Sequence, residues 1–425
     1  MTTDTRSTHN KATDNSAASG QPQALSGIRV LDLSRVLAGP WASQILGDFG
    51  ADIIKIEQPG KGDDTRVWGP PFRGDDAEQV AAYYLSCNRN KRSLALDIAS
   101  PEGADIVRQL ARHSDIVIEN FKVGGLKKYG LDYDSLRAEN PGLIYCSVTG
   151  FGQDGPYAGR GGYDFLIQAM GGLMSVTGPA EGEPGSEPTK VGVAVSDLFT
   201  GLYATIAIQA ALRHREHSGE GQHIDCALLD STVAILANQS MNYLVGGKTP
   251  TRMGNAHPNV VPYRPFAVAD GHIVVAVGND RQFCALCKLL GRDDLSQDPR
   301  FKDNAGRLQH RGALESQLEL ELAERQRDEI LAQMIQHGVP GGPINTIEQV
   351  FADPHVQARE LLQAMPDGHG GTLPLTRFPA KLSRTPASIR QPPPQLGEHS
   401  DELLRERLGL DAAQIAKLRQ QGVLG

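Results

Sequence analysis

One carboxylate, Asp197, stands at the front of a long apolar run, VGVAVSDLFTGLYATIAIQAAL (residues 191–212). Two roles suit a carboxylate in this place. Ser196 or Asp197 could cap the helix that begins here, by accepting hydrogen bonds from its free backbone N–H groups. Alternatively, a carboxylate held at the mouth of an apolar element is a candidate nucleophile. Because caps are common and nucleophiles are rare, these residues alone favour the cap.

Two other side chains could take part in chemistry, and each also has a structural explanation. Asp164 follows two glycines and Tyr163 and opens a predicted helix, so it could cap that helix or orient a reacting group. His257 follows the Gly254-Asn255 loop and could touch a substrate, although loop histidines are usually solvated.

Composition predicts an ordinary globular enzyme with two or three domains. The chain has 425 residues, of which 40% are hydrophobic and 22% charged. Its net charge of −8, with acidic and basic residues mixed, disfavours a nucleic-acid partner. The five scattered cysteines form no disulfide framework and fit the cytoplasm, our predicted location. Cys284 and Cys287 lack the second ligand pair that a zinc site needs, so we predict no metal.

The ends of the chain and its longest apolar run bear on membrane attachment. Residues 1–24 contain no apolar segment and predict a disordered leader rather than a signal peptide or an anchor. The apolar run at 198–212 is interrupted by Thr, Gly and Gln and is too short to span a bilayer. We therefore predict a buried helix and no membrane partner.

Strand and helix patterns alternate along the first part of the chain. Strands are expected at 27–34, 52–59, 93–100, 115–121 and 143–152, with helices within 35–50, 101–114 and 131–142. This alternation predicts an α/β fold with a parallel sheet covered on both faces. Ligands bind such sheets beyond the carboxyl ends of the strands. Neither G-x-G-x-x-G nor G-x-x-x-x-G-K-[ST] occurs, which disfavours dinucleotide and P-loop sites, and with them a dehydrogenase.

The later part of the chain predicts a second, smaller α/β domain. A helix over 197–214, a strand over 221–227 and a long helix through Leu244 complete a large domain at 25–245. A strand at 272–278 and helices near 280–291, 311–323 and 327–337 then follow, and we place the small domain at 246–330. Residues 331–425 are expected to return to the large domain.

Several segments, in this order, resemble the class III CoA-transferase family. The segments are VLDLSRVLAGPWASQILGDFGADIIKIEQP, NRNKRSLALDIASPEG, DIVIENF, GGYDFLIQAMGG, VGVAVSDLFTGLYATIAIQAALRHREHSGEGQHIDCALLD, GVPGGPI, DPHV and LGEHSDE. The similarity begins near residue 25 and continues to the C-terminus. It implies a Rossmann-like large domain built from both ends of the chain, a small domain, and a homodimer of two interlocked rings.

The resemblance also implies a chemistry. Asp197 becomes the catalytic carboxylate, which attacks a thioester and afterwards carries CoA as an aspartyl thioester. No cofactor is held permanently, and the partners are an acyl-CoA and a carboxylic acid. The regions GGYDFLIQAMGG and HPNVVPYRPF are similar to members that act on short dicarboxylic acids, with succinyl-CoA as a common donor. Arg66, Arg160 or Arg264 could bind the far carboxylate of such an acid.

The CoA-binding positions of the family carry over residue by residue. Leu37 stands where some members have Gln, Gln58 where some have Arg, and Lys128 where the family can have Arg. Met253-Gly254-Asn255 corresponds to the family's mobile glycine loop, although few glycines remain here. The implied contacts with CoA and the active site are Val36, Leu37, Ala38, Gln58, Leu96, Asn120, Phe121, Lys128, Tyr163 and Asp164.

Two other functions compete with the transferase. An α-methylacyl-CoA racemase shares the fold but needs acid–base groups on both sides of the α-carbon. That branch has a histidine where this chain has Tyr163, and tyrosine is a poor base at neutral pH because its hydroxyl ordinarily titrates near ~10. A CoA- or nucleotide-binding regulator without catalytic activity is the other alternative.

Overall fold

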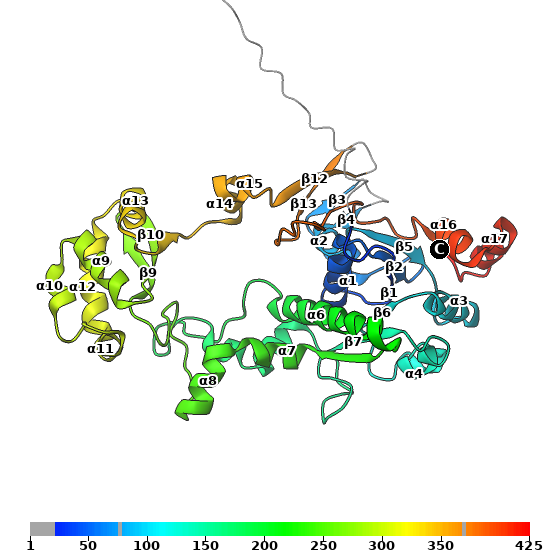
Figure 1. The fold of residues 1–425 in the computed structure, drawn as a ribbon, viewed down its shortest axis with the longest axis horizontal. Helices are drawn as coiled ribbons and strands as arrows, with labels where there is room; N and C mark the ends of the chain where they lie inside the picture. The colour runs from blue at the N-terminus through cyan, green and yellow to red at the C-terminus, as the bar shows by residue number, and fades with distance from the viewer. Residues whose placement is uncertain (1–21, 75–78, 368–370) are drawn as a thin grey trace, which may run out of the picture.

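The computed structural model describes residues 22–74, 79–367 and 371–425. Two lobes are joined by two separate connections, with the small lobe at the left of Figure 1 and the large lobe at the right. The large lobe contains a six-stranded sheet, and the small lobe contains a three-stranded sheet. The predicted leader, residues 1–24, lies outside the described residues except for its last three.

The central sheet of the large lobe is parallel throughout, as the alternating pattern predicts. Its strand order is β5-β2-β1-β6-β7-β8. The bounds are β1 Arg29–Asp32, β2 Asp52–Glu57, β5 Lys91–Ala95, β6 Ile116–Glu119, β7 Ile144–Thr149 and β8 His223–Ala227. Because every strand runs in the same direction, the loops that follow the strands gather at one edge of the sheet.

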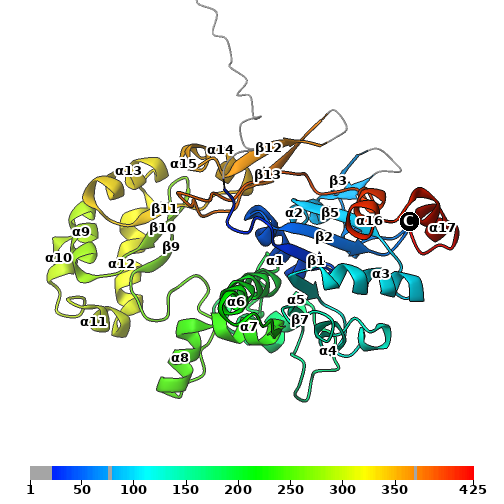
Figure 2. The same ribbon diagram turned by 45° about the vertical axis from the view of Figure 1, so that its right-hand side comes forward.

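Helices cover both faces of this sheet. Alternate residues of one strand point to opposite faces, so Leu31 joins one hydrophobic cluster and Val30 the other. On one face pack α3 (Pro101–Arg112), α4 (Tyr133–Arg137), α16 (Ser400–Leu408) and α17 (Ala412–Gln420). On the other face pack α1 (Ala38–Asp48) and α6 (Val195–Ser218) (Figure 2). The predicted α/β class is confirmed.

The C-terminal segment returns to the large lobe and fastens onto β5. The Gly425 N–H donates to the Ala95 carbonyl at 3.0 Å, and Leu424 forms a β-bridge with Leu96. Helices α16 and α17 contribute Leu403, Leu404 and Ile415 to the cluster behind the sheet. The two ends of the chain therefore build one core.

The small lobe is built on an antiparallel sheet, β9 (Tyr263–Val268), β10 (Gly271–Ala276) and β11 (Gly341–Pro343). Helices α9 (Asp280–Leu290), α12 (Arg311–Ala323) and α13 (Arg327–His337) cover it. Its hydrophobic cluster runs from Val261 to Val339. The predicted boundary at 330 thus falls inside α13, because that helix buries Ile330 and Met334 in this lobe.

Two helices differ from the expected ranges. Helix α6 has 24 residues and is long and apolar enough, by length and composition alone, to cross a membrane. Core helices of soluble proteins can meet the same criterion, and the predicted apolar run 198–212 lies within α6, which packs here against α1. The expected helix through Leu244 is two helices, α7 (Leu228–Ile235) and α8 (Ala237–Gly246), broken where Ala237 has a φ of 44°.

The other elements are short. They are β3 Phe72–Arg73, β4 Val80–Ala81, α2 Ala82–Ser86, α5 Asp164–Met170, α10 Asp293–Gln297, α11 Asn304–Gln309, α14 Ile347–Ala352, α15 Pro354–Ala358, β12 Leu362–Pro366 and β13 Thr372–Thr376.

Candidate active site

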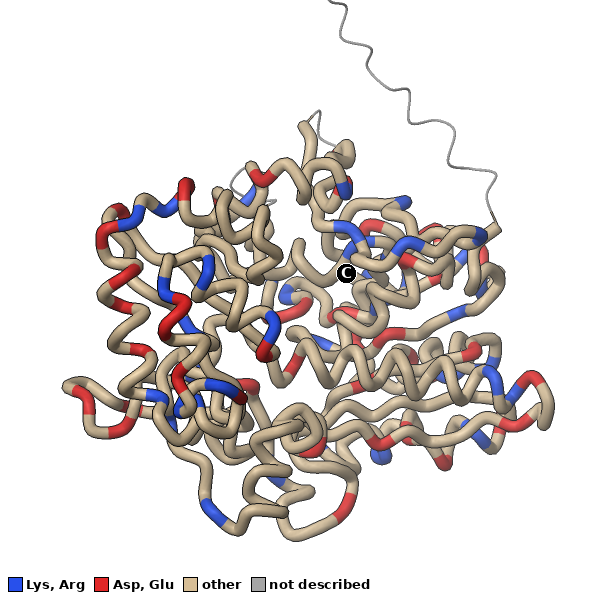
Figure 3. Tube along the Cα trace, turned by 60° about the vertical axis from the view of Figure 1, so that its left-hand side comes forward, with Lys and Arg blue, Asp and Glu red and all other residues tan. Residues whose placement is uncertain are grey.

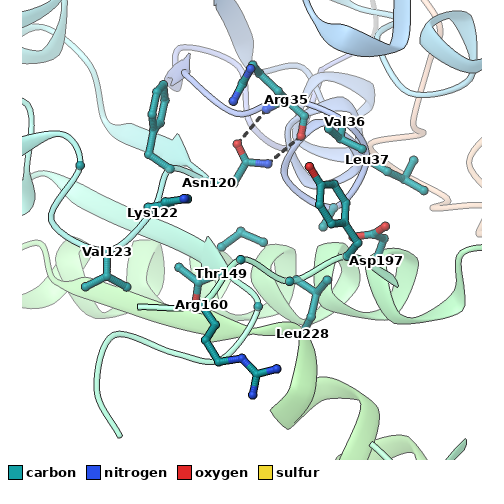
Figure 4. A pocket seen from close by; sticks show the side chains of 18 of the residues that line it. Arg35, Val36, Leu37, Asn120, Lys122, Val123, Thr149, Arg160, Asp197 and Leu228 are labelled. Atoms are coloured by element: carbon teal, nitrogen blue, oxygen red, sulfur yellow. Dashed lines mark hydrogen bonds between the residues drawn. The ribbon is translucent and has the colours of Figure 1, made fainter. Parts of the chain in front are cut away.

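A cavity of about 500 Å³ opens at the carboxyl edge of the central sheet. The loops after β1, β6 and β7 form its walls, together with the first turn of α6. Figure 4 shows Arg35 and Leu37 on the wall opposite Lys122 and Val123, with Asp197 at one end. The site residues inferred from the sequence that line this cavity are Val36, Leu37, Ala38, Asn120, Phe121, Lys128, Tyr163 and Asp197.

A second, smaller cavity of about 230 Å³ adjoins the first and contains two more of these residues, Gln58 and Leu96. Arg35 and Phe121 line both cavities. The two spaces therefore meet along the ends of β1 and β6. Asp164 lines neither cavity.

Asp197 lies in the first turn of α6 and faces the larger cavity (Figure 4). Within the described residues, no donor forms a hydrogen bond with its carboxylate, so it does not cap the helix. Burial raises the pKa of Asp197, and the nearby Asp164 charge raises it further, to about 7. The carboxylate is thus unpaired, partly desolvated and close to its titration point at neutral pH.

Asp164 supplies the cap that Asp197 does not. Its Oδ1 accepts a hydrogen bond from the Ser196 N–H at 2.8 Å, and its Oδ2 accepts one from Gln168 Nε2 at 2.7 Å. Asp164 begins α5, so a residue of one helix caps the amino end of another. The prediction that Asp164 caps its own helix was wrong, because its carboxylate turns toward α6.

Tyr83 lies near Asp197 and was not identified from the sequence. Its ring meets Trp68 edge to face, with the centroids 5.4 Å apart. Burial raises the pKa of Tyr83 to about 12, and the negative charge of Asp197 is the next cause. Tyr83 therefore keeps its hydroxyl proton at neutral pH. No motif around residue 83 would have identified it.

Asn120 holds the opposite wall of the cavity. Its Oδ1 accepts from the Arg35 N–H at 2.9 Å, and its Nδ2 donates to the Arg35 carbonyl at 2.6 Å (Figure 4). The Arg35 guanidinium lies over the Phe121 ring, 5.8 Å from its centroid. The loop after β6 therefore fixes the loop after β1.

Cations gather around this cavity although Lys and Arg alternate with Asp and Glu over the rest of the trace (Figure 3). Lys122, Lys128, Arg35 and Arg160 all belong to its lining. Lys128 rests over the Tyr129 ring, with its ammonium 4.6 Å from the centroid. Arg35 pairs with Asp64 of the same lining at 3.0 Å, so the positive charge of the cavity comes mainly from the other three residues.

The three arginines considered for a substrate carboxylate have different surroundings. Arg66 is buried and donates to both carboxylate oxygens of Glu57 at 2.8 Å. Arg264 pairs with Glu315 and Glu319 in the small lobe. Arg160 lines the Asp197 cavity, and within the described residues it pairs with no carboxylate.

The remaining candidates lie away from Asp197. His257 accepts a hydrogen bond from the Asn259 N–H and does not line the cavity. The loop Met253–Asn255 lines a separate cavity beside the small lobe, together with Arg264. The loop is absent from the described lining of the Asp197 cavity. Cys287 packs in the core of the small lobe, whereas Cys284 is exposed on α9.

Comparisons with known proteins identify the family of this chain. The model of CoA-transferase family III matches residues 25–400. The chain is 53% identical to the succinate–glutarate CoA-transferase of Agrobacterium fabrum over 90% of this chain and 95% of that protein. It is 42% identical to the human succinyl-CoA:glutarate CoA-transferase over 95% of this chain and 92% of that protein. A CAIB/BAIF family protein from Brucella suis superposes with a TM-score of 0.80, at 51% identity, covering 91% of this chain and all of that one. The chain belongs to CoA-transferase family III.

Proposed function

We propose that this enzyme moves CoA from succinyl-CoA to a short dicarboxylic acid, with Asp197 as the nucleophile. The single observation that carries the proposal is the Asp197 carboxylate at the end of the strand-edge cavity, which has no hydrogen-bond or ion-pair partner in the described part of the chain. The relatives named for CoA transfer between succinate and glutarate support the donor and the acceptor. Glutarate is accordingly the first acceptor to test.

Each step conserves the thioester energy without an added cofactor. A carboxylate oxygen of Asp197 attacks the thioester carbonyl, the C–S bond breaks, and CoA leaves as a thiolate. The thiolate then attacks the Asp197 carboxyl carbon of the mixed anhydride, which releases succinate and leaves an aspartyl-CoA thioester. The acceptor carboxylate repeats these steps in reverse, and Asp197 is regenerated. Because water would hydrolyse both intermediates, the half-buried position of Asp197 suits this chemistry.

The larger cavity is proposed to hold the CoA chain. The loop of Val36, Leu37 and Ala38 would contact its apolar part, and Lys128 would bind a phosphate as a point charge. Gln58 and Leu96 would contact the far end of the cofactor in the adjoining cavity. In this arrangement the thioester end would lie toward Asp197.

Arg160 is proposed to bind the far carboxylate of the acid. It lines the same cavity as Asp197, and its guanidinium lies 4.7 Å from the Tyr157 centroid and 5.1 Å from that of Phe151. Stacking on two rings orients the planar fork that a carboxylate can engage in a bidentate pair. Arg66 and Arg264 are already paired with glutamates.

A homodimer is proposed to cover the apolar faces that one chain leaves exposed. On α6 the exposed side chains are Phe199, Leu202, Tyr203 and Ile206. On α8 they are Met241, Tyr243, Leu244 and Val245. Apolar patches of this kind mark protein–protein contacts in soluble proteins. The two connections between the lobes would let two chains interlock. Light scattering after gel filtration measures the mass of the assembly and so tests for the homodimer.

Trapping of the covalent intermediate tests the proposed function. The enzyme is mixed with succinyl-CoA, quenched in acid and analysed by intact-mass spectrometry, followed by peptide mapping. The expected result is a CoA adduct on the peptide that contains Asp197. Asp197→Asn should carry no adduct and exchange no labelled glutarate into glutaryl-CoA. A CoA adduct or undiminished exchange in a folded Asp197→Asn variant would refute the assignment.

Deuterium exchange distinguishes the racemase. A racemase incorporates solvent deuterium at the α-carbon of a 2-methylacyl-CoA, whereas a transferase does not. The side chain at the position where racemases carry a base, Tyr163, is 69% exposed at the rim of the cavity. We therefore expect no incorporation. A CoA-binding regulator would bind CoA and form neither the adduct nor the exchanged product.

A further inference from the structure

The loop from Ser34 to Val36 is held along its whole backbone by side chains from other elements. The Ser34 carbonyl accepts from Lys55 Nζ at 2.8 Å. Asn120 binds the N–H and the carbonyl of the next residue. The Val36 N–H donates to both carboxylate oxygens of Asp63, at 3.2 and 3.3 Å. This loop forms a wall of the proposed CoA cavity, so its conformation sets the shape of that wall.

Val36 has a conformation that its residue type disfavours. Its φ is 73°, in the left-handed region, where the branched Cβ of valine collides with the backbone. Such a residue persists only where its surroundings over-determine its conformation. The neighbouring Leu37 then begins α1 as its N-cap residue without a side-chain cap. The strained residue is thus the point at which the chain turns from β1 into the helix.

Asp63 is the side chain that binds the N–H of this strained residue. It forms an ion pair with Lys55 at 2.9 Å, and neither side chain is exposed to solvent. Its Oδ1 also accepts from the Thr65 N–H at 3.0 Å and the Thr65 hydroxyl at 2.8 Å. Burial acts to raise the pKa of Asp63, but the Lys55 charge and the bonds from Thr65 lower it overall, to about 2. Asp63 is therefore an anion at every pH at which the enzyme would work.

We propose that the buried Lys55–Asp63 pair is a positioning device that holds Val36 in its left-handed conformation and thereby preshapes the CoA cavity. Asp63 acts through the Val36 N–H, Lys55 acts through Asp63 and the Ser34 carbonyl, and neither side chain lines the proposed CoA cavity. The inference rests on the proposed function, because it takes this cavity as the CoA site. A wall fixed before binding spares the ligand the cost of ordering it.

A double-mutant cycle on Val36 and Asp63 tests the proposal. The four proteins are the wild type, Val36→Gly, Asp63→Asn and the double variant, and calorimetry gives the dissociation constant of CoA for each. Asp63→Asn should weaken CoA binding about tenfold. Glycine adopts a positive φ without the steric cost, so in the Val36→Gly background the same change should cost only about twofold to threefold. If Asp63→Asn lowered the affinity for CoA by the same factor in the wild-type and Val36→Gly backgrounds, the proposal would be overturned.

A matched control separates positioning from stability. Thr65→Val also removes a hydrogen bond to Asp63 and is equally buried, but it leaves the Val36 contact in place. It should lower the melting temperature without changing CoA affinity. If Asp63→Asn alone does not fold, the Lys55→Met, Asp63→Asn variant leaves neither charge unpaired and takes its place in the cycle.

Hydrogen exchange gives a readout that needs neither CoA nor activity. The amide hydrogens of the peptide that contains residues 34–37 should exchange faster in Asp63→Asn than in the wild type. In Thr65→Val their exchange rate should equal that of the wild type. Equal protection of this peptide in Asp63→Asn would refute the device even if CoA did not bind. Conversely, CoA binding without transfer to any acid would refute the proposed function and leave the positioning device intact.

Discussion

The carboxylate of Asp164 binds the backbone N–H of Ser196 at 2.8 Å, one residue before Asp197. Asp164, from α5, thus caps the amino end of α6. Asp197, in the first turn of α6, accepts no hydrogen bond from the described residues. The two negative charges also act on each other, because Asp164 contributes to the raised pKa of Asp197. Structural capping and nucleophilic attack are divided between two side chains.

The pH dependence of transfer should report this interaction. The nucleophile must be ionised, so kcat/KM with succinyl-CoA should rise with pH and reach half its plateau near pH 7, at the pKa of Asp197. Asp164→Asn removes a like charge, which lowers the pKa of Asp197 and moves this limb to lower pH. Rates measured between pH 5 and 9 with both enzymes check the prediction. If kcat/KM of Asp164→Asn rose over the same pH range as that of the wild type, the prediction would be contradicted.

Asp197→Asn should stabilise the fold while it abolishes transfer. The pKa of Asp197 is raised from an ordinary 3.8 to about 7, so keeping this group ionised in the folded state costs free energy that the unfolded chain does not incur. The cost appears as the pH rises above about 4 and is complete above pH 7. We expect a gain on the order of 1 to 4 kcal/mol at pH 8 and little at pH 4. Urea unfolding at both pH values measures it, and an equal gain at both would contradict the linkage.

Lys128 should bind a phosphate of CoA. Removing one charge-assisted hydrogen bond costs about 1.5–3 kcal/mol, so Lys128→Ala should raise the KM for succinyl-CoA about tenfold or more. Lys127 is an exposed neighbour outside the cavity lining, which makes Lys127→Ala the matched control. Comparison with dephospho-CoA shows whether the 3′-phosphate is the group that is bound. An equal rise in the KM for succinyl-CoA in Lys128→Ala and Lys127→Ala would indicate a general effect of lost positive charge instead.

Arg160 should set the preference for dicarboxylic acids. Arg160→Gln is expected to lower kcat/KM for glutarate by about tenfold to a hundredfold, with little effect on a monocarboxylic acid of the same length. Arg264→Gln serves as the control because Arg264 is paired with Glu315 and lines another cavity. Competition between the two acids, read by mass spectrometry of the CoA products, gives the ratio directly. An unchanged ratio in Arg160→Gln would exclude this role.

The sequence predicted the central fold well because its signals are local. Apolar strands alternating with amphipathic helices identified the parallel sheet, and the loops after β1 and β6 were expected at its ligand edge. The break between α7 and α8 was missed, because an alanine at a φ of 44° leaves no mark in composition. The predicted boundary of the small lobe at residue 330 differs from the structure, because α13 packs its apolar residues into the core of that lobe.

The supporting residues of the site were harder to find. Asp164 was noticed, but its partner on α6 depends on how two helices meet. Tyr83 and Asp63 approach the site only through tertiary contacts. Lys55 did carry a signal, since a lysine inside the buried strand DIIKIE requires a buried partner. The identity of that partner could not be deduced from spacing.

Helix α6 combines two properties that usually belong to different parts of an enzyme. Its first turn presents the reactive carboxylate, and its side bears a strip of large apolar residues that a lone chain leaves bare. At Gly201 it approaches α1 so closely that an added Cβ would lie 2.7 Å from the Ala38 carbonyl oxygen. A variant in which α6 does not pack against α1 would therefore lose activity and become prone to aggregation at the same time. Aggregation in a mutant library thus becomes a simple visible reporter of whether the catalytic centre has assembled.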